Sequence, residues 1–282
     1  MKPKKKIAFI TGASNGIGRV TAIELAKVGF YVVIAGRSKQ KNQSVIDEIN
    51  SFTDSNSCEW LSLDLQSFES IKSCVNIFLK SHRSLSLLIN NAGIAGLSGI
   101  TSDGFEVGFG VNHLGHFLLT NLLLDSLKKS TNARVVTVSS MAHKHAKFID
   151  WDLLTKKTSS ISGISEYATS KLANILFSRE LSKKLFGTNV STYCLHPGVV
   201  DTNIWQNLPF LLKPILKLRG MLTPAEGART TLYCSLDAPH NESGYYYSNK
   251  KIDSPSQIAK SDALAIELWE RSYEWTSKFM QF

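Results

Sequence analysis

Short, continuous apolar runs alternate along the chain with longer amphipathic stretches. The runs are rich in β-branched residues, as in strands buried on both faces, and they occupy residues 7–10, 31–35, 60–63, 85–89, 135–138 and 190–195. Helical spacing of apolar residues marks the stretches 20–28, 71–79, 117–127 and 172–185. This alternation predicts βαβ units and therefore an α/β fold, a Rossmann-type doubly wound parallel sheet with helices on both faces.

The alternation runs through residues 1–282 without a Pro/Gly/Ser-rich linker or an internal repeat, so we expect a single domain. One segment departs from the pattern, because residues 203–223 combine apolar side chains with prolines and basic residues. A doubly wound sheet binds its ligand at the carboxyl ends of its strands, and an insertion at that place predicts a substrate loop. Residues 262–278 are predicted to form a closing amphipathic helix.

The composition is that of an ordinary globular protein, with 43% hydrophobic and 20% charged residues. Part of the formal charge of +9 comes from leading lysines that we interpret as a solvated flank: Lys2, Lys4, Lys5 and Lys6. Charge alone does not indicate a nucleic-acid partner. No apolar stretch reaches the length of about 18 residues that a membrane span needs, and no signal-peptide pattern follows the basic start. We therefore expect a cytoplasmic protein.

Neither the cysteines nor the histidines predict a metal or redox centre. The cysteines lack metal-ligand or CxxC spacing and are predicted to be reduced packing residues: Cys58, Cys74, Cys194 and Cys234. Several histidines lack acidic or cysteine partners at metal spacing and are interpreted as non-ligands: His113, His116, His143 and His145.

A glycine-rich turn follows the first predicted strand and opens the first helix. Its spacing from Gly12 through Gly16 to Gly18 is Gly-x-x-x-Gly-x-Gly. Glycines in this position allow a tight turn and close backbone approach to a pyrophosphate, which the helix N-terminus then stabilises. The turn therefore indicates a dinucleotide site.

The second predicted strand ends at Ala35, where an NAD enzyme usually places a carboxylate against the ribose hydroxyls. This chain has Gly36, Arg37 and Ser38 there instead. A carboxylate would repel a 2′-phosphate, whereas a guanidinium pairs with it in a bidentate way. The sequence therefore favours NADP(H) over NAD(H).

Tyr167 and Lys171 are four residues apart in a helical stretch, so their side chains share one face. An ammonium there favours the tyrosinate, whose ordinary pKa of about 10 is too high for acid–base work near neutrality. The same spacing recurs at Tyr246 and Tyr247 in a strand-like segment, where it gives no comparable constellation.

Polar residues at the ends of neighbouring predicted strands support this choice. Ser139 and Ser140 end the strand at 135–138, and Asn90, Asn91, Ala92 and Gly93 end the strand before it. Carboxyl ends of parallel strands meet at one edge of the sheet, so these groups are expected to converge on Tyr167 and Lys171.

These motifs stand in a fixed order: Thr-Gly-Ala-Ser-Asn-Gly-Ile-Gly from Thr11, Asn-Asn-Ala-Gly from Asn90, Tyr-Ala-Thr-Ser-Lys from Tyr167, and Pro-Gly from Pro197. Over nearly the whole chain they resemble the short-chain dehydrogenase/reductase family. Four further stretches resemble its retinol dehydrogenase-like branch: Val-Asn-His-Leu-Gly-His-Phe-Leu-Leu-Thr from Val111, Ser-Ser-Met-Ala-His from Ser139, Ser-Lys-Leu-Ala-Asn from Ser170, and His-Pro-Gly-Val-Val from His196. Protochlorophyllide reductases share the first of these four.

The resemblance implies an enzyme that acts on CH–OH and C=O groups. Tyr167 would give a proton to the substrate oxygen, Ser140 would hydrogen-bond that oxygen, and Lys171 would bind the nicotinamide ribose and lower the tyrosine pKa. Asn112 would hold a water in the proton relay. The implied cofactor contacts are Gly12, Ser14, Asn15, Gly16, Ile17, Gly18, Arg37, Asp64, Leu65, Asn91, Ala92, Gly93, Tyr167, Lys171, Pro197, Gly198, Val200 and Thr202.

Residues 205–221 are apolar enough to line or cover a pocket, which favours a hydrophobic aldehyde or ketone as substrate. The same segment is basic and amphipathic, so peripheral membrane contact is an alternative. Branch members often carry an N-terminal membrane anchor, whereas this chain starts just before its first predicted strand, which counts against retinoids. Two other functions stay open: a protochlorophyllide reductase-like enzyme and a non-catalytic NADP-sensing protein. The family resemblance also implies a homodimer or homotetramer.

Overall fold

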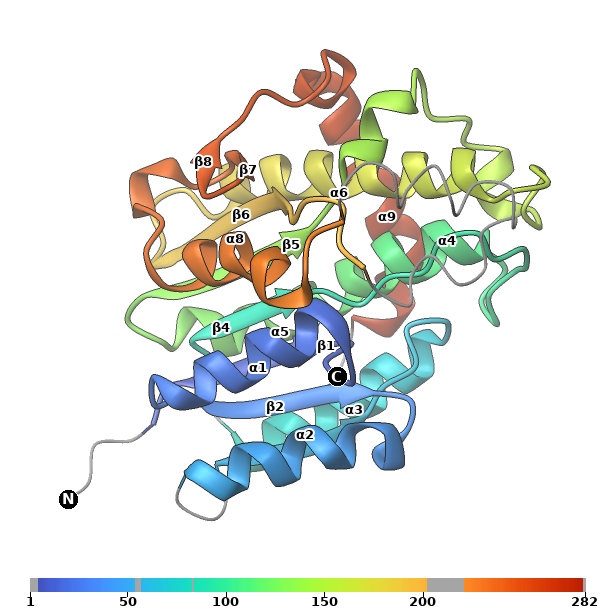
Figure 1. Cartoon of the computed structure of the whole chain (residues 1–282). Coiled ribbons are helices and arrows are strands. Elements are labelled where there is room, and N and C mark those ends of the chain that lie inside the picture. The colour runs from blue at the N-terminus through green and yellow to red at the C-terminus, as the bar shows by residue number, and fades with distance from the viewer. Residues whose placement is uncertain (1–4, 54–56, 83, 202–220, 281–282) are drawn as a thin grey trace.

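A computed structural model describes residues 5–53, 57–82, 84–201 and 221–280 (Figure 1). The described strands form one eight-stranded sheet in the order β3-β2-β1-β4-β5-β6-β7-β8, and only β7 and β8 pair in antiparallel fashion. The strands are β1 (Ile7–Thr11), β2 (Tyr31–Gly36), β3 (Cys58–Ser62), β4 (Leu87–Asn90), β5 (Ala133–Val138), β6 (Val190–His196), β7 (Tyr246–Ser248) and β8 (Lys251–Ile252). The predicted α/β fold with a doubly wound parallel sheet is confirmed.

Helices cover both faces of this sheet (Figure 1). The long helices are α1 (Gly16–Lys27), α2 (Lys39–Phe52), α3 (Phe68–Ser81), α5 (Gly115–Lys128), α6 (Ile164–Lys184), α8 (Pro224–Leu236) and α9 (Asp262–Thr276). Short turns are α4 (Val107–Phe109), η1 (Gly110–Leu114), η2 (Met141–His145), η3 (Leu153–Thr155), η6 (His240–Glu242), η7 (Ile258–Lys260) and η8 (Ser277–Phe279). The two cores place α1, α2 and α8 on one face and α3, α5, α6 and α9 on the other.

Strand β1 shows why the apolar runs are continuous. Its alternate side chains enter opposite cores: Ala8 and Ile10 pack with α1 and α2, whereas Ile7 and Phe9 pack with α3 and α5. Because both faces of a parallel strand are buried, every position along it favours an apolar residue. All five residues of β1 are accordingly buried.

The structure differs from the sequence pattern at several elements. The strand predicted at 60–63 lies at Cys58–Ser62, and the one predicted at 85–89 lies at Leu87–Asn90. Helix α2 is absent from the predicted set because its sequence is largely polar; its N-cap Ser38 accepts a hydrogen bond from the Lys41 amide. Helix α8 is absent from it as well and starts with a capping box between Thr223 and Glu226.

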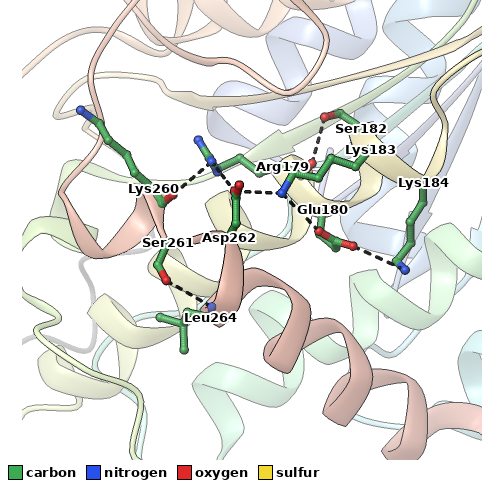
Figure 2. A network of polar contacts seen from close by, with 9 residues as sticks. All are labelled: Arg179, Glu180, Ser182, Lys183, Lys184, Lys260, Ser261, Asp262 and Leu264. Carbon is green, nitrogen blue, oxygen red and sulfur yellow. Dashed lines mark hydrogen bonds and ion pairs between the residues drawn. The ribbon is translucent and has the colours of Figure 1, made fainter.

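The predicted closing helix is confirmed as α9, followed by the short turn η8. Figure 2 shows its first residue, Asp262, paired with Arg179 and Lys183 of α6. Further along, the Trp269 ring lies 4.9 Å from the ring of Phe117 on α5 and 5.9 Å from that of Phe177 on α6. The C-terminal helix therefore packs across both α5 and α6.

The predicted substrate loop falls largely on residues 202–220, which lie outside the described part. Its two flanks meet, since Val200 and Leu222 form an isolated parallel bridge. None of the described helices combines the length and the apolar character needed to cross a lipid bilayer.

Candidate active site

The glycine-rich turn joins β1 to α1 and packs against the end of β4. Gly12 and Gly16 have φ angles of 70° and 56°, in the left-handed region that favours glycine. A Cβ on Gly12 would lie 2.8 Å from the Ala92 Cα, and one on Gly18 would lie 2.4 Å from the Gly12 carbonyl oxygen. Only glycine fits these positions, and the space beside the turn stays open to a ligand.

A cavity of about 530 Å³ lies at the carboxyl edge of the sheet. Its lining contains the glycine-rich turn, the end of β2 at Arg37, and the residues Ser140, Tyr167 and Lys171. All the implied cofactor contacts line it except Thr202, which lies outside the described residues. A narrow glycine cradle joined to a polar cleft has the form that a dinucleotide needs.

Tyr167 and Lys171 lie in the first half of α6, and both side chains are buried. The Tyr167 and Ser140 hydroxyls are hydrogen-bonded to each other. The Lys171 Nζ lies 5.6 Å from the centre of the tyrosine ring and donates to the Val138 carbonyl at 2.9 Å. The structure thus brings together the three residues that the sequence selects, from a strand end and a helix.

Burial sets the protonation states of this group. It raises the pKa of Tyr167 to about 12, while the hydrogen bond from Ser140 acts in the lowering direction. Burial lowers the pKa of Lys171 to about 8. The tyrosine is therefore protonated at neutral pH and able to donate. A lowering effect of Lys171 on the tyrosine pKa stays a prediction.

Asn112 takes a different place from the other expected residues. It is fully buried on the π-helical turn η1 and is not part of the cavity lining. Its side-chain amide accepts from the Ile94 N–H at 2.8 Å and donates to the Ile94 carbonyl at 3.0 Å and to Ser170 Oγ at 2.9 Å. Ile94 itself lines the cavity, so Asn112 connects the lining to α6.

Sequence reasoning missed part of the lining. On the first turn of α2, Lys41 and Asn42 join Arg37 and Ser38 in the cavity wall. The signal was the position of Lys41 four residues after Arg37, at the start of a helix whose polar sequence hid it. Other missed lining residues are Ala35, Leu63, Gln66, Ile94, Ala95, Val111, Val138 and His196.

The cysteines are free and buried, as their spacing predicts. Among the described residues, no group of three or more His, Cys, Asp or Glu side chains is placed to hold a metal ion. Instead, His113 hydrogen-bonds Ser272 of α9 at 2.9 Å, and His143 hydrogen-bonds the Ser140 carbonyl at 2.7 Å.

Known proteins share this architecture. The family model for short chain dehydrogenases matches residues 6–151. Human retinol dehydrogenase 12 is 43% identical, over 95% of this chain and 85% of the relative. Dehydrogenase/reductase SDR family member 13 from Bos taurus is 39% identical, over 95% and 72% of the two chains. A solved structure from Mycobacterium paratuberculosis has a TM-score of 0.77 and 34% identity, and the match covers 96% of this chain and 93% of that one. The chain therefore belongs to the short-chain dehydrogenase family of oxidoreductases, in its retinol dehydrogenase-like branch.

Proposed function

We propose that this protein is an NADP(H)-dependent oxidoreductase that interconverts a hydrophobic aldehyde or ketone and its alcohol. The observation that carries the proposal is a single cavity that joins a glycine cradle and a basic end at Arg37 to the Ser140–Tyr167–Lys171 group. The similarity to proteins named retinol dehydrogenases supports a carbonyl or alcohol substrate.

The chemistry of the site follows from its protonation states. Bound NADPH would supply the hydride. The Tyr167 hydroxyl, which burial keeps protonated, donates its proton to the substrate oxygen, and Ser140 holds that oxygen by a hydrogen bond. Lys171 holds the nicotinamide ribose and supplies positive charge beside the forming tyrosinate. Asn112 fixes Ile94 and, in this proposal, holds a water of the proton relay.

The preference for NADP(H) rests on the end of β2 and the start of α2. Arg37 and Lys41 both line the cavity there, and no Asp or Glu lies at the end of the strand. Two cations and a helix N-terminus together favour a phosphate over the free 2′-hydroxyl of NAD(H). Lys41 is thus a second cation beside Arg37, which by itself indicates the same preference from the sequence.

A hydrophobic substrate is supported by apolar residues that follow the lining. Met141 comes directly after Ser140 and is 45% exposed, and Leu97 comes shortly after the lining residue Ala95 and is 39% exposed. The lid expected at 205–221, and membrane contact through it, fall outside the described residues except for Met221. A cytoplasmic location and assembly into dimers or tetramers remain part of this proposal.

The first test measures NADPH and NADH oxidation against retinal, medium-chain aldehydes, steroids and aromatic ketones, with Tyr167→Phe in parallel. We expect NADPH-dependent turnover that falls by roughly 10²–10⁴-fold in the variant, since the proton donor is lost while the ring remains. Tyr246→Phe, another buried tyrosine, is the control and should keep wild-type rates.

Two results would redirect the proposal. Tight NADPH binding without turnover on any substrate favours the NADP-sensing protein. Light-dependent reduction of protochlorophyllide favours the other alternative.

A further inference from the structure

A buried chain of hydrogen bonds runs from α5 to the floor of the cofactor cavity through His116. The imidazole Nδ1 lies 3.1 Å from the Asn112 carbonyl oxygen, and Nε2 lies 2.9 Å from Thr11 Oγ1. His116 is 1% exposed, and both Thr11 and Asn112 are fully buried. The ring therefore joins the π-helical turn η1 to the end of β1 without access to water.

The partners determine which nitrogen carries the proton. A carbonyl oxygen only accepts, so Nδ1 must donate to Asn112. Thr11 Oγ1 accepts from the backbone N–H groups of Asn91 and Ala92, both at 3.0 Å. Its hydroxyl proton then goes to Nε2 at 2.9 Å in preference to the Ile89 carbonyl at 3.4 Å. His116 is thus neutral, and an imidazolium would leave Nε2–H without an acceptor.

The electrostatic surroundings favour the same state. Burial lowers the pKa of His116 to about 4, and the charge of Lys171 acts in the same direction. Burial also lowers the pKa of the neighbouring His113 on η1 to about 3, and its electrostatic interaction with His116 acts in the same direction. The hydrogen-bond chain therefore keeps one arrangement across the physiological pH range.

The chain of hydrogen bonds ends at the wall of the cavity. Asn91 and Ala92 both line it, and the Asn91 side chain donates to the carbonyl oxygens of Thr11 and Gly12 at 2.8 and 3.0 Å. Ala92 lies against Gly12, where an added Cβ would clash. A shift of the Thr11 hydroxyl would therefore move two backbone groups that the cofactor contacts in the proposed function.

We propose that His116 is a positioning residue of the cofactor site, which orients the Thr11 hydroxyl so that it aligns the backbone amides of Asn91 and Ala92. The proposal rests on the NADP(H)-dependent function above. His116 also couples η1, which carries Asn112, to the floor of the cavity, because its rigid ring bonds to both.

The test compares NADPH dissociation constants and steady-state parameters for four variants. His116→Phe should weaken NADPH binding about tenfold, the effect of one buried hydrogen bond, with a smaller change in kcat. Thr11→Val should weaken it at least as much, because it also removes the acceptor of the Asn91 and Ala92 amides. The double variant should bind no more weakly than Thr11→Val alone, because both substitutions break the same hydrogen-bond chain. His116→Gln offers an acceptor to Thr11 and should recover most of the affinity.

His113→Phe is the matched control, since it removes a neighbouring buried histidine whose partner is Ser272 of α9. It should leave the NADPH dissociation constant unchanged. An equal loss in His113→Phe, or additive losses in the double variant, would overturn the positioning role. If His116→Phe does not fold, Thr11→Val and His116→Gln carry the comparison.

A second readout uses the wild-type protein. Nitrogen-15 NMR of the His116 ring should show a neutral imidazole with the proton on Nδ1 at pH 7. The other tautomer or an imidazolium contradicts the proposed chain. If the variants bind NADPH as well as the wild type does, the positioning role alone is overturned. If the wild type binds neither NADPH nor NADH, the proposed function is overturned and the positioning role with it.

Discussion

Tyr167 and Lys171 show how burial alone separates the roles of two neighbouring residues. Transfer out of water disfavours the charged form of each, so the same cause raises the pKa of the tyrosine to about 12 and lowers that of the lysine to about 8. At neutral pH the tyrosine keeps its proton and the lysine keeps its charge. As the pH rises, Lys171 is the first of the pair to change state.

This order predicts the pH dependence of carbonyl reduction. We expect kcat/KM to fall as the pH rises through about 8, because Lys171 loses the charge that, in the proposed function, holds the ribose and assists the tyrosinate. In Lys171→Arg the guanidinium stays protonated, so the decline should move to higher pH. The measurement is a pH series of turnover and of NADPH affinity. An identical decline in both proteins would assign it to another group.

At the scale of elements, α9 is docked on α6 and α5 by two kinds of contact. The ion pairs of Asp262 with Arg179 and Lys183 lie at the surface, as Figure 2 shows, and the aspartate side chain is 60% exposed. Leu268 on the same helix is 1% exposed and belongs to the main core. Exposed ion pairs are screened by water, so the buried leucine should contribute more than the ion pairs to the free energy that holds α9 in place.

We expect Leu268→Ala to lower the free energy of unfolding by about 2–5 kcal/mol. Asp262→Asn should lower it by less than about 1 kcal/mol, and less still at high salt. Urea unfolding of both variants measures the difference, with Ile266→Ala on the exposed side of α9 as the control. A larger loss in Asp262→Asn than in Leu268→Ala would show that the charged contacts hold the helix.

At the scale of the whole molecule, the cavity lies where the sheet changes its order of winding. Strand β1 has β2 on one side and β4 on the other, so the connections leave this point in opposite directions. The lining accordingly combines Gly12 after β1, Arg37 after β2 and Ser140 after β5. A ligand in this cavity bridges both halves of the fold and should stabilise the molecule as a unit.

We therefore expect NADPH at about 100 times its dissociation constant to add about 2.7 kcal/mol of stability and to raise Tm by roughly 5–10 °C. The same concentration of NADH should raise Tm less. Arg37→Asp should abolish this difference, while Lys39→Ala, at the first residue of α2 and outside the lining, should preserve it. Thermal unfolding by fluorescence checks each case. An equal rise for both nucleotides in the wild type contradicts the NADP(H) preference.

Six of the strands, the glycine-rich turn and the proposed catalytic residues could be predicted from the sequence. These are local signals. A strand buried on both faces must be apolar throughout, and the turn at Gly12 admits no side chain. Tyr167 and Lys171 are four residues apart on α6 and therefore share one face of the helix. The carboxyl ends of such parallel strands meet at one edge, which is why the amino-acid pattern alone predicts Ser140 beside Tyr167.

The residues from distant segments that complete the site are selected by packing and could not be predicted from the sequence. His116 and Thr11 are 105 residues apart in the chain, and no periodicity links them. Lys41 enters the lining because α2 folds on three buried aliphatic residues within a polar sequence, too few for the pattern to reveal. The position of α9 across α5 and α6 likewise depends on packing between helices. Local sequence encodes a residue's preference, whereas its partner is selected when the layers pack.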